Sequence, residues 1–170
     1  MKKSLVISFS LALLGVTLPA ALAQTADDPA QADTVAWTIT SQPQGDVAPG
    51  SKLALTLQGT VQEGWHVYGL KQLPDGPTPL LVALDANPVA VADGAPKASA
   101  PTKLRDPSFG LVTQFYAQPF SVTVPVRIAA HSAAGQQVIP LSVRFQTCNG
   151  RICQPPKTVH LSASVMVRPE

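Results

Sequence analysis

Hydrophobic and polar residues alternate along much of the chain with a period of two. In the segment 120–128 every second residue is large and apolar, and the residues between them are Ser, Thr, Pro and Arg. The segments 52–61, 139–145 and 159–168 repeat this pattern, and shorter candidates lie at 35–41, 65–68 and 79–84. Such alternation is typical of β-strands that are buried on one face only.

No stretch keeps helical spacing over three turns, and the 17 prolines are unfavourable for helices. Short strands separated by Gly, Pro and Asp turns predict an all-β, antiparallel immunoglobulin-like β-sandwich over residues 35–170. Proline lacks an amide hydrogen, so we expect the strands that contain Pro125 and Pro140 to be sheet edges or to bulge there. The segment 92–102, ADGAPKASAPT, is predicted to be a flexible loop.

The first residues indicate export. Lys2 and Lys3 precede a short apolar run, and Ala21-Leu22-Ala23 presents small residues at the positions that a signal peptidase reads. We therefore predict a signal peptide over residues 1–23, a disordered lead-in over 24–34 and a periplasmic location for the mature protein. The apolar run is shorter than the ~20 residues of a transmembrane helix, so we expect no stable membrane insertion.

The charge of the chain argues against a nucleic-acid partner. Removing Lys2 and Lys3 leaves ten Lys plus Arg against ten Asp plus Glu, so the formal net charge falls from +2 to zero. A neutral and sparsely charged surface provides no basic patch for a polyanion. We therefore expect no nucleic acid as a partner.

Two cysteines, Cys148 and Cys153, are the residues best suited to chemistry. Asn149-Gly150 between them is a strong tight-turn dipeptide, so the segment can fold back and bring the two sulfurs together. In an exported protein they will meet oxidising conditions. In the chain-entropy model, a disulfide that closes a loop of about six residues stabilises a fold by only roughly 2 kcal/mol. Spacing alone leaves both a structural staple and a redox-active pair open.

Two other hypotheses compete with a redox role. A non-catalytic binding or scaffold module would use the disulfide only as a staple. A copper or zinc site would need the two cysteines and a histidine, but no second Cys or His lies at ligand spacing. We therefore expect no metal and no other cofactor.

Three segments together resemble the amino-terminal periplasmic domain of the thiol:disulfide interchange protein DsbD. They are the hairpin F-Q-T-C followed by C-Q-P-P at 145–156, the aromatic strand G-W-H-V-Y at 64–68, and the loop D-P-S-F-G at 106–110. The cysteine motif is the most specific of the three. The resemblance spans residues 37–167.

The resemblance implies a thiol–disulfide carrier, and so an oxidoreductase of the protein-disulfide reductase type. It would accept electrons from a membrane thiol reductase and pass them to thioredoxin-like or disulfide isomerase proteins. Cys153 would form the mixed disulfide and Cys148 would resolve it. In this reading Phe109 covers the sulfurs as part of a cap loop.

The remaining site residues follow from the same resemblance. Trp65 or Tyr68 would form the floor of the site, and Asp106 belongs to the cap loop, where we favour a role in holding the turn. His66 and His160 are interpreted as surface or packing residues.

The chain departs from the family pattern in two places. Four residues separate the cysteines, one fewer than in the best-known member, and Phe109 falls one place later after Asp106. Because the chain ends at Glu170, without membrane or thioredoxin-like portions, the resemblance also implies that the electron donor is a separate polypeptide.

Overall fold

The computed structural model describes residues 34–169, and this part of the chain consists of strands joined by turns. The strands are β1 (Val35–Ser41), β2 (Lys52–Val61), β3 (His66–Tyr68), β4 (Leu81–Leu84), β5 (Ala90–Ala92), β6 (Lys97–Ala98), β7 (Thr102–Asp106), β8 (Leu111–Tyr116), β9 (Phe120–Ile128), β10 (Gly135–Phe145), β11 (Thr147–Cys148) and β12 (Lys157–Val167). The predicted signal peptide, and the lead-in up to residue 33, lie outside the described residues. Within residues 34–169 no helix could cross a membrane.

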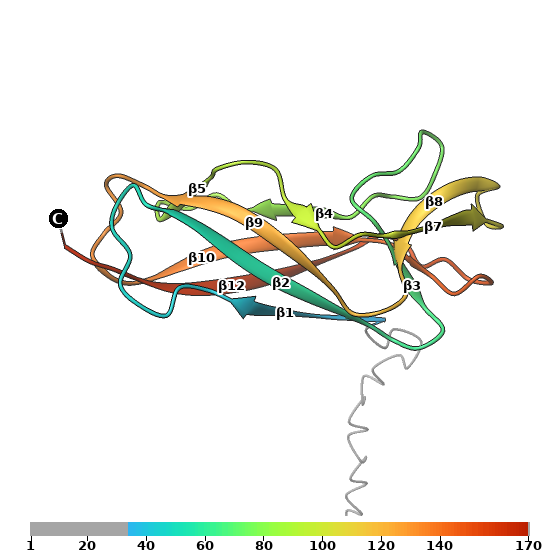
Figure 1. The fold of residues 1–170 in the computed structure, drawn as a ribbon, viewed down its shortest axis with the longest axis horizontal. Helices are drawn as coiled ribbons and strands as arrows, with labels where there is room; N and C mark the ends of the chain where they lie inside the picture. The colour runs from blue at the N-terminus through green and yellow to red at the C-terminus, as the bar shows by residue number, and fades with distance from the viewer. Residues whose placement is uncertain (1–33, 170) are drawn as a thin grey trace, which may run out of the picture. The chain divides into compact units, whose positions relative to one another are not determined.

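Three antiparallel sheets make up the described fold. One has the order β1-β2-β9-β5, with β6 also paired to β9, and a second has the order β12-β10-β4. Figure 1 shows these two sheets layered along the length of the sandwich, with β3, β7 and β8 at one end. Those three strands and β11 form the third sheet, in the order β11-β3-β8-β7. The predicted all-β, antiparallel immunoglobulin-like sandwich is confirmed.

The core lies on the strand faces that the period-two pattern predicts. Along β9 buried and half-buried residues alternate without exception, and on β10 the same alternation runs from Ile139 to Phe145 apart from exposed Arg144. On β12, Ala163, Val165 and Val167 are buried, whereas Val159 and Leu161 are half-buried against the same core. Each fully buried Val, Leu or Ile contributes about 1.5–3 kcal/mol relative to exposure. The inward faces of these strands therefore stabilise the sandwich.

The prediction that the two prolines lie in edge strands is wrong, and the pairings of β9 with β2 and of β10 with β12 show no register shift that would mark a bulge. Pro125 lies on β9, which is flanked by β2 on one side and by β5 and β6 on the other, and Pro140 lies on β10, between β12 and β4. At each proline, one of the two neighbouring strands has ended. The carbonyl of Pro125 accepts from the amide of Asp93, just after β5, and that of Pro140 accepts from Asp85, just after β4. The missing amide therefore falls at a gap in the ladder rather than at an edge.

Part of the segment 92–102 is also more regular than predicted. It contains the end of β5, the whole of β6 and the first residue of β7. Lys97 and Ala98 of β6 pair with Thr123 and Val122 of β9, and the amide of Ser99 donates to the carbonyl of Ser121 at 3.0 Å. Pairing with a distant strand therefore orders residues whose local composition is that of a loop.

Candidate functional site

The end sheet, β11-β3-β8-β7, has one face on the core. Residues directly opposed on neighbouring antiparallel strands share a face. Thr147 of β11 opposes Val67 of β3, which in turn opposes Tyr116 of β8. All three are buried, at 2%, 0% and 6% exposure. The core thus holds this sheet rigidly from one side.

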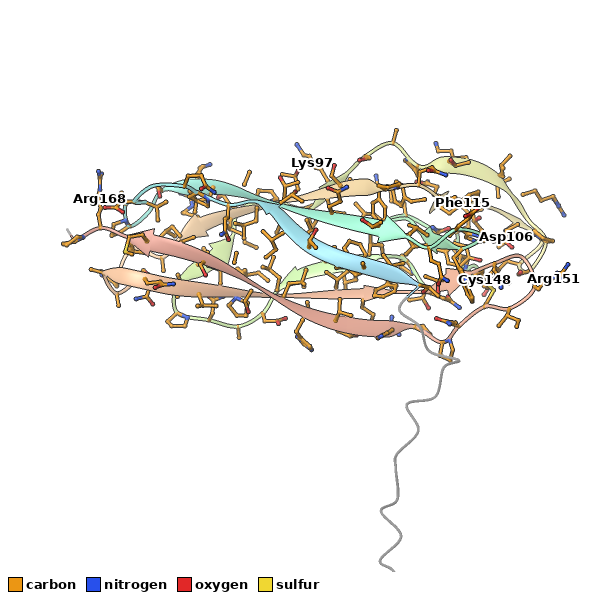
Figure 2. All side chains as sticks on the ribbon, turned by 90° about the horizontal axis from the view of Figure 1, so that it is seen from below. Lys97, Asp106, Phe115, Cys148, Arg151 and Arg168 are labelled. Atoms are coloured by element: carbon orange, nitrogen blue, oxygen red, sulfur yellow. A yellow bond between two sulfur atoms is a disulfide. The ribbon has the colours of Figure 1, made fainter. Side chains whose placement is uncertain are left out.

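The other face of the end sheet carries the candidate site. Cys148 opposes His66 on β3, and Tyr68, two residues further along β3, opposes Phe115 on β8. Figure 2 shows Cys148, Phe115 and Asp106 at the same end of the described fold. This face therefore brings the sulfur of Cys148 next to the imidazole of His66 and the phenol of Tyr68, which lie about 80 residues earlier in the sequence.

The two cysteines form a disulfide within one hairpin, as the sequence predicts. Their Cα atoms are 4.1 Å apart, and residues 148 and 153 form an antiparallel bridge. The side-chain oxygen of Asn149 accepts from the amides of Arg151 and Ile152 at 3.0 and 2.8 Å. Gly150 has a φ of 80°, which favours glycine. The Asn-Gly pair thus builds the turn that closes the bond.

The two sulfur-bearing residues differ in exposure. Cys148 is fully buried, whereas Cys153 is partly exposed and follows Ile152, whose exposure is 63%. The amide of Gln154 donates to the carbonyl of Thr147 at 2.9 Å and holds the second arm of the hairpin against the first. A thiol from outside can therefore approach Cys153 more readily than Cys148.

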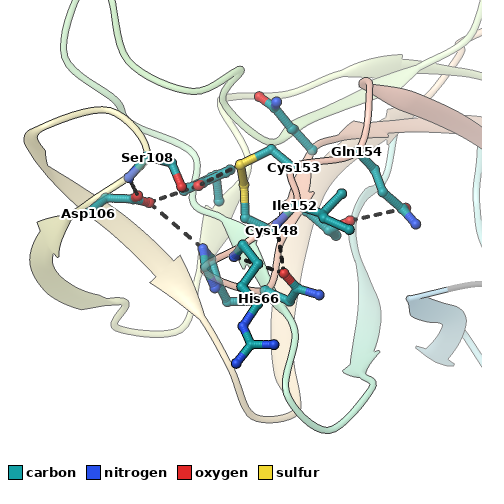
Figure 3. The surroundings of a disulfide bond; sticks show 12 residues. His66, Asp106, Ser108, Cys148, Ile152, Cys153 and Gln154 are labelled. Atoms are coloured by element: carbon teal, nitrogen blue, oxygen red, sulfur yellow. Dashed lines mark hydrogen bonds and ion pairs between the residues drawn. A yellow bond between two sulfur atoms is a disulfide. The ribbon is translucent and has the colours of Figure 1, made fainter.

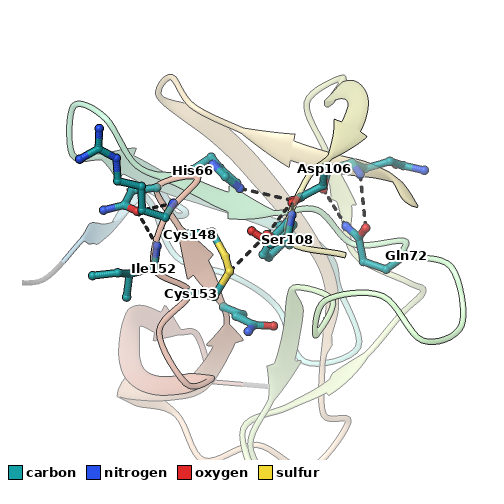
Figure 4. Close-up of polar contacts among 12 residues, drawn as sticks. His66, Gln72, Asp106, Ser108, Cys148, Ile152 and Cys153 are labelled. Carbon is teal, nitrogen blue, oxygen red and sulfur yellow. Dashed lines mark hydrogen bonds and ion pairs between the residues drawn. A yellow bond between two sulfur atoms is a disulfide. The ribbon is translucent and has the colours of Figure 1, made fainter. Parts of the chain in front are cut away.

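Tyr68 and Asp106 form a buried hydrogen-bonded pair beside the disulfide. The hydroxyl of Tyr68 donates to Oδ2 of Asp106 at 2.8 Å and lies 4.0 Å from Sγ of Cys153. Burial raises the pKa of the Tyr68 phenol above its usual value, and the hydrogen bond to Asp106 raises that pKa further. Figures 3 and 4 show Asp106 turned toward the disulfide from the β7–β8 side. Tyr68 therefore stays protonated and can act as a hydrogen-bond donor to sulfur or to carboxylate.

Asp106 also closes the turn between β7 and β8. Its Oδ1 accepts from the amide of Ser108 at 2.8 Å, and its carbonyl accepts from the amide of Gly110 at 2.8 Å. Gly110 has a φ of 67°, and the turn carries Phe109 at its tip. One carboxylate oxygen thus shapes the cap loop while the other contacts the site.

His66 is a packing residue, as one of its two interpretations holds, and it packs on the same face of the end sheet as Cys148. Its Nε2 lies 3.8 Å from Oδ2 of Asp106, is buried and has no hydrogen-bond partner. The ring packs against Phe115 and Tyr68, with centroids 4.8 and 5.1 Å apart. Burial lowers the pKa of His66, and the Asp106 carboxylate partly opposes that effect. The alternation in W-H-V-Y already placed His66 on the same face as Tyr68, and this was the signal that sequence reasoning missed.

The proposed cap and floor residues are only partly brought together. The ring of Phe109 meets that of Tyr68 edge-on, with centroids 5.8 Å apart at 89°, and Phe109 is half-buried. Trp65 instead lines an open pocket together with Glu63, His66 and other residues. Tyr68 and Asp106 therefore lie beside the disulfide and Phe109 packs on Tyr68, while Trp65 lines a neighbouring pocket.

Metal binding receives no support from the described residues. Within 34–169 there is no group of three or more His, Cys, Asp or Glu side chains arranged to hold an ion. The chemistry that the arrangement does support is exchange at the sulfurs, next to a protonated phenol, a carboxylate and an imidazole.

A comparison with models of protein families agrees with this chemistry. Residues 30–164 match the family model described as "Thiol:disulfide interchange protein DsbD, N-terminal". A crystal structure of the DsbD N-terminal domain from Neisseria meningitidis, in the reduced form, matches with 18% sequence identity and a TM-score of 0.47. That match covers 66% of this chain and 78% of the other. No curated protein sequence matches.

Proposed function

The chain belongs to the family of DsbD amino-terminal domains, a thiol:disulfide interchange family, and from this premise we propose a periplasmic electron carrier. It accepts electrons from a membrane thiol reductase and passes them, through Cys148 and Cys153, to thioredoxin-like or disulfide isomerase proteins. The unequal exposure of the two cysteines is the observation that carries this proposal.

The exchange proceeds through a mixed disulfide. A thiolate of the reduced donor attacks Sγ of Cys153, the Cys148–Cys153 bond breaks, and Cys148 leaves as a thiolate that takes up a proton. The second donor thiolate then attacks the donor's own sulfur in the mixed disulfide and releases Cys153. The donor is oxidised to a disulfide, and this domain gains two electrons and two protons.

Delivery to the acceptor reverses these roles. The Cys153 thiolate attacks the acceptor disulfide, one acceptor sulfur leaves and is protonated, and Cys148 then attacks Cys153. The reduced acceptor is released and the Cys148–Cys153 bond re-forms. Burial of Cys148 supports its assignment as the resolving residue, because a buried sulfur reacts with its neighbour and not with a second protein.

The Tyr68–Asp106 pair supports exchange at Cys153 in particular. The phenol lies 4.0 Å from Sγ of Cys153, so a modest shift allows the hydroxyl to donate to a forming thiolate. Hydrogen bonding to a charged form favours that form. Tyr68 and Asp106 are therefore proposed as site residues together with the cap residue Phe109, and Trp65 is proposed to border the site.

The reduction potential of the Cys148–Cys153 pair tests the proposed function. A carrier should equilibrate near the thioredoxin and isomerase range, about −270 to −180 mV, because electrons must both enter and leave. The measurement uses the mature protein in defined thiol–disulfide buffers, with the two forms separated after alkylation. A value well below about −300 mV would identify a structural staple and support the scaffold alternative.

Replacing the cap aromatic should accelerate reduction by a small thiol. In Phe109→Ala the ring that packs on Tyr68 is lost, so we expect the disulfide to be reduced several-fold faster than in the unmodified protein. Stopped-flow reduction under pseudo-first-order conditions measures this rate. Val91→Ala, which truncates a 51% exposed side chain on β5, is the matched control. An unchanged rate in Phe109→Ala would show that this ring does not shield the sulfurs.

A further inference from the structure

His66 presents an unusual buried nitrogen. Its Nε2 has no hydrogen-bond partner, although Oδ2 of Asp106 lies 3.8 Å away. Leaving a buried polar atom unpaired is unfavourable, so a second state in which the atom is paired would offset that cost. In the disulfide-bonded structure, Nε2 of His66 is therefore free to gain a hydrogen-bond partner or a proton.

Each structural element around His66 contributes an identifiable group. Tyr68 comes from the same strand, Asp106 from β7 and the non-titrating ring of Phe115 from β8. Cys148 of β11 is directly opposed to His66 in the ladder. Figures 3 and 4 show the His66 side chain beside Cys148 and pointing toward Asp106. Glu63 lines the open pocket that His66 also lines.

Reduction changes the charge balance of this cluster. The disulfide is neutral, but a reduced pair with one thiolate places a negative charge near the Asp106 carboxylate. Like charges disfavour ionisation, and an opposite charge within about 4–6 Å favours it. Among the side chains of His66, Tyr68, Asp106, Phe115 and Cys148, that of His66 is the one that can become cationic.

We propose that His66 is the proton acceptor of the reduced site, so that one cysteine remains a thiolate paired with a His66 imidazolium. The inference rests on the proposed function and deepens it. A donor with two thiols loses two electrons and two protons. The Cys148–Cys153 bond takes up both electrons, one proton goes to a cysteine sulfur and the other goes to His66. The site is then reduced and already holds a nucleophile for the acceptor.

The position of His66 gives that proton a path to water. Its side chain is 17% exposed, and the open pocket next to it is lined by Glu63 and Gln118. Nε2 faces inward, whereas the residue as a whole borders the pocket. A proton can therefore enter or leave through His66 without displacing the cap loop at Phe109.

The protonation state of His66 in the oxidised protein agrees with this role. Burial lowers its pKa from 6.5 and Asp106 raises it by a smaller amount, so the ring is neutral at neutral pH while the disulfide is intact. A thiolate formed beside it would raise that pKa. Reduction should thus be accompanied by proton uptake at this side chain.

An NMR titration of the unmodified protein tests the inference directly. The His66 ring signals are followed against pH in the oxidised and in the fully reduced state. We expect the His66 pKa to lie below 6.5 in the oxidised state and to be higher in the reduced state. Equal His66 pKa values in the two states would overturn the proposal.

A variant provides the second readout. In reduced His66→Gln we expect the thiolate fraction at neutral pH, read from ultraviolet thiolate absorbance, to fall roughly tenfold, because the imidazolium that favours the charged sulfur is lost. The alkylation rate should fall only about threefold, because intrinsic nucleophilicity rises with thiol pKa. The control is His160→Gln, which removes an exposed histidine whose Nδ1 lies 3.3 Å from Asp85. An identical thiolate titration in His66→Gln and in the unmodified protein would contradict the role.

These measurements need no protein partner, because a small dithiol reduces the site. Failure of the carrier function would appear as a strongly reducing potential or as no adduct with any thioredoxin-like protein. Failure of the His66 role would appear as a redox-independent His66 pKa in a protein whose potential still lies in the carrier range.

Discussion

A Cys148→Ala protein should accumulate covalent adducts with an oxidised thioredoxin-like protein, whereas Cys153→Ala should form few or none. The remaining thiol of Cys148→Ala belongs to the partly exposed Cys153, which can attack the partner's disulfide. No second cysteine is then present to resolve the mixed disulfide. In Cys153→Ala the remaining thiol is the fully buried Cys148, which a protein-sized partner cannot reach without rearrangement of the hairpin.

A non-reducing gel after incubation with the oxidised partner measures the difference in adduct yield. The double variant, without either cysteine, is the control for non-covalent association that survives the gel. Equal yields from the two single variants would remove the assignment of attacking and resolving roles. If neither single variant formed adducts, the disulfide would be assigned a structural role, in favour of the scaffold hypothesis.

Asp106→Ala should destabilise the oxidised protein by about 2–4 kcal/mol. The substitution removes the acceptor for the hydroxyl of the fully buried Tyr68 and the acceptor for the amide of Ser108. The buried hydroxyl of Tyr68, left without its acceptor, costs about 1–3 kcal/mol, and loss of the hydrogen bond to the exposed Ser108 adds about 0.5–1.5 kcal/mol. Urea denaturation with the disulfide intact measures the loss in the free energy of unfolding.

The matched control for this substitution is Asp85→Ala. Asp85 faces exposed His160 at 3.3 Å, and a surface pair of this kind contributes about 0–1 kcal/mol. The two variants thus compare a carboxylate in a buried hydrogen-bonded pair with one in a solvent-exposed pair. A loss in Asp106→Ala that does not exceed the loss in Asp85→Ala would show that the buried carboxylate does not hold the site together.

Most strands could be predicted from the sequence because their signal is local. The alternation over 120–128 and 139–145 needs no knowledge of neighbouring strands, since each strand simply places every second side chain in the core. The disulfide hairpin was predictable for a similar reason. Asn149 and Gly150 supply both the turn conformation and the side-chain acceptor within the six residues that the bond closes.

The prolines and the short strand β6 were not predictable in this way. Whether Pro125 lies in an edge strand depends on the strands that pair with β9, and those are far away in the sequence. A proline is tolerated within an interior strand when the neighbouring strand is interrupted at the same level. Local composition does not contain that information.

The sequence by itself determined the long strands of the sandwich, their one-sided burial and the cysteine hairpin. Tertiary structure decided what surrounds the sulfurs. Tyr68 and Asp106 are 38 residues apart, and Cys153 lies 85 residues beyond Tyr68, so only the pairing of β3 with β8 and β11, and of β8 with β7, brings these groups together. The same pairing buries His66 and leaves its Nε2 without a partner. Burial and proximity set the protonation of these groups, and both arise only when the sheet has formed.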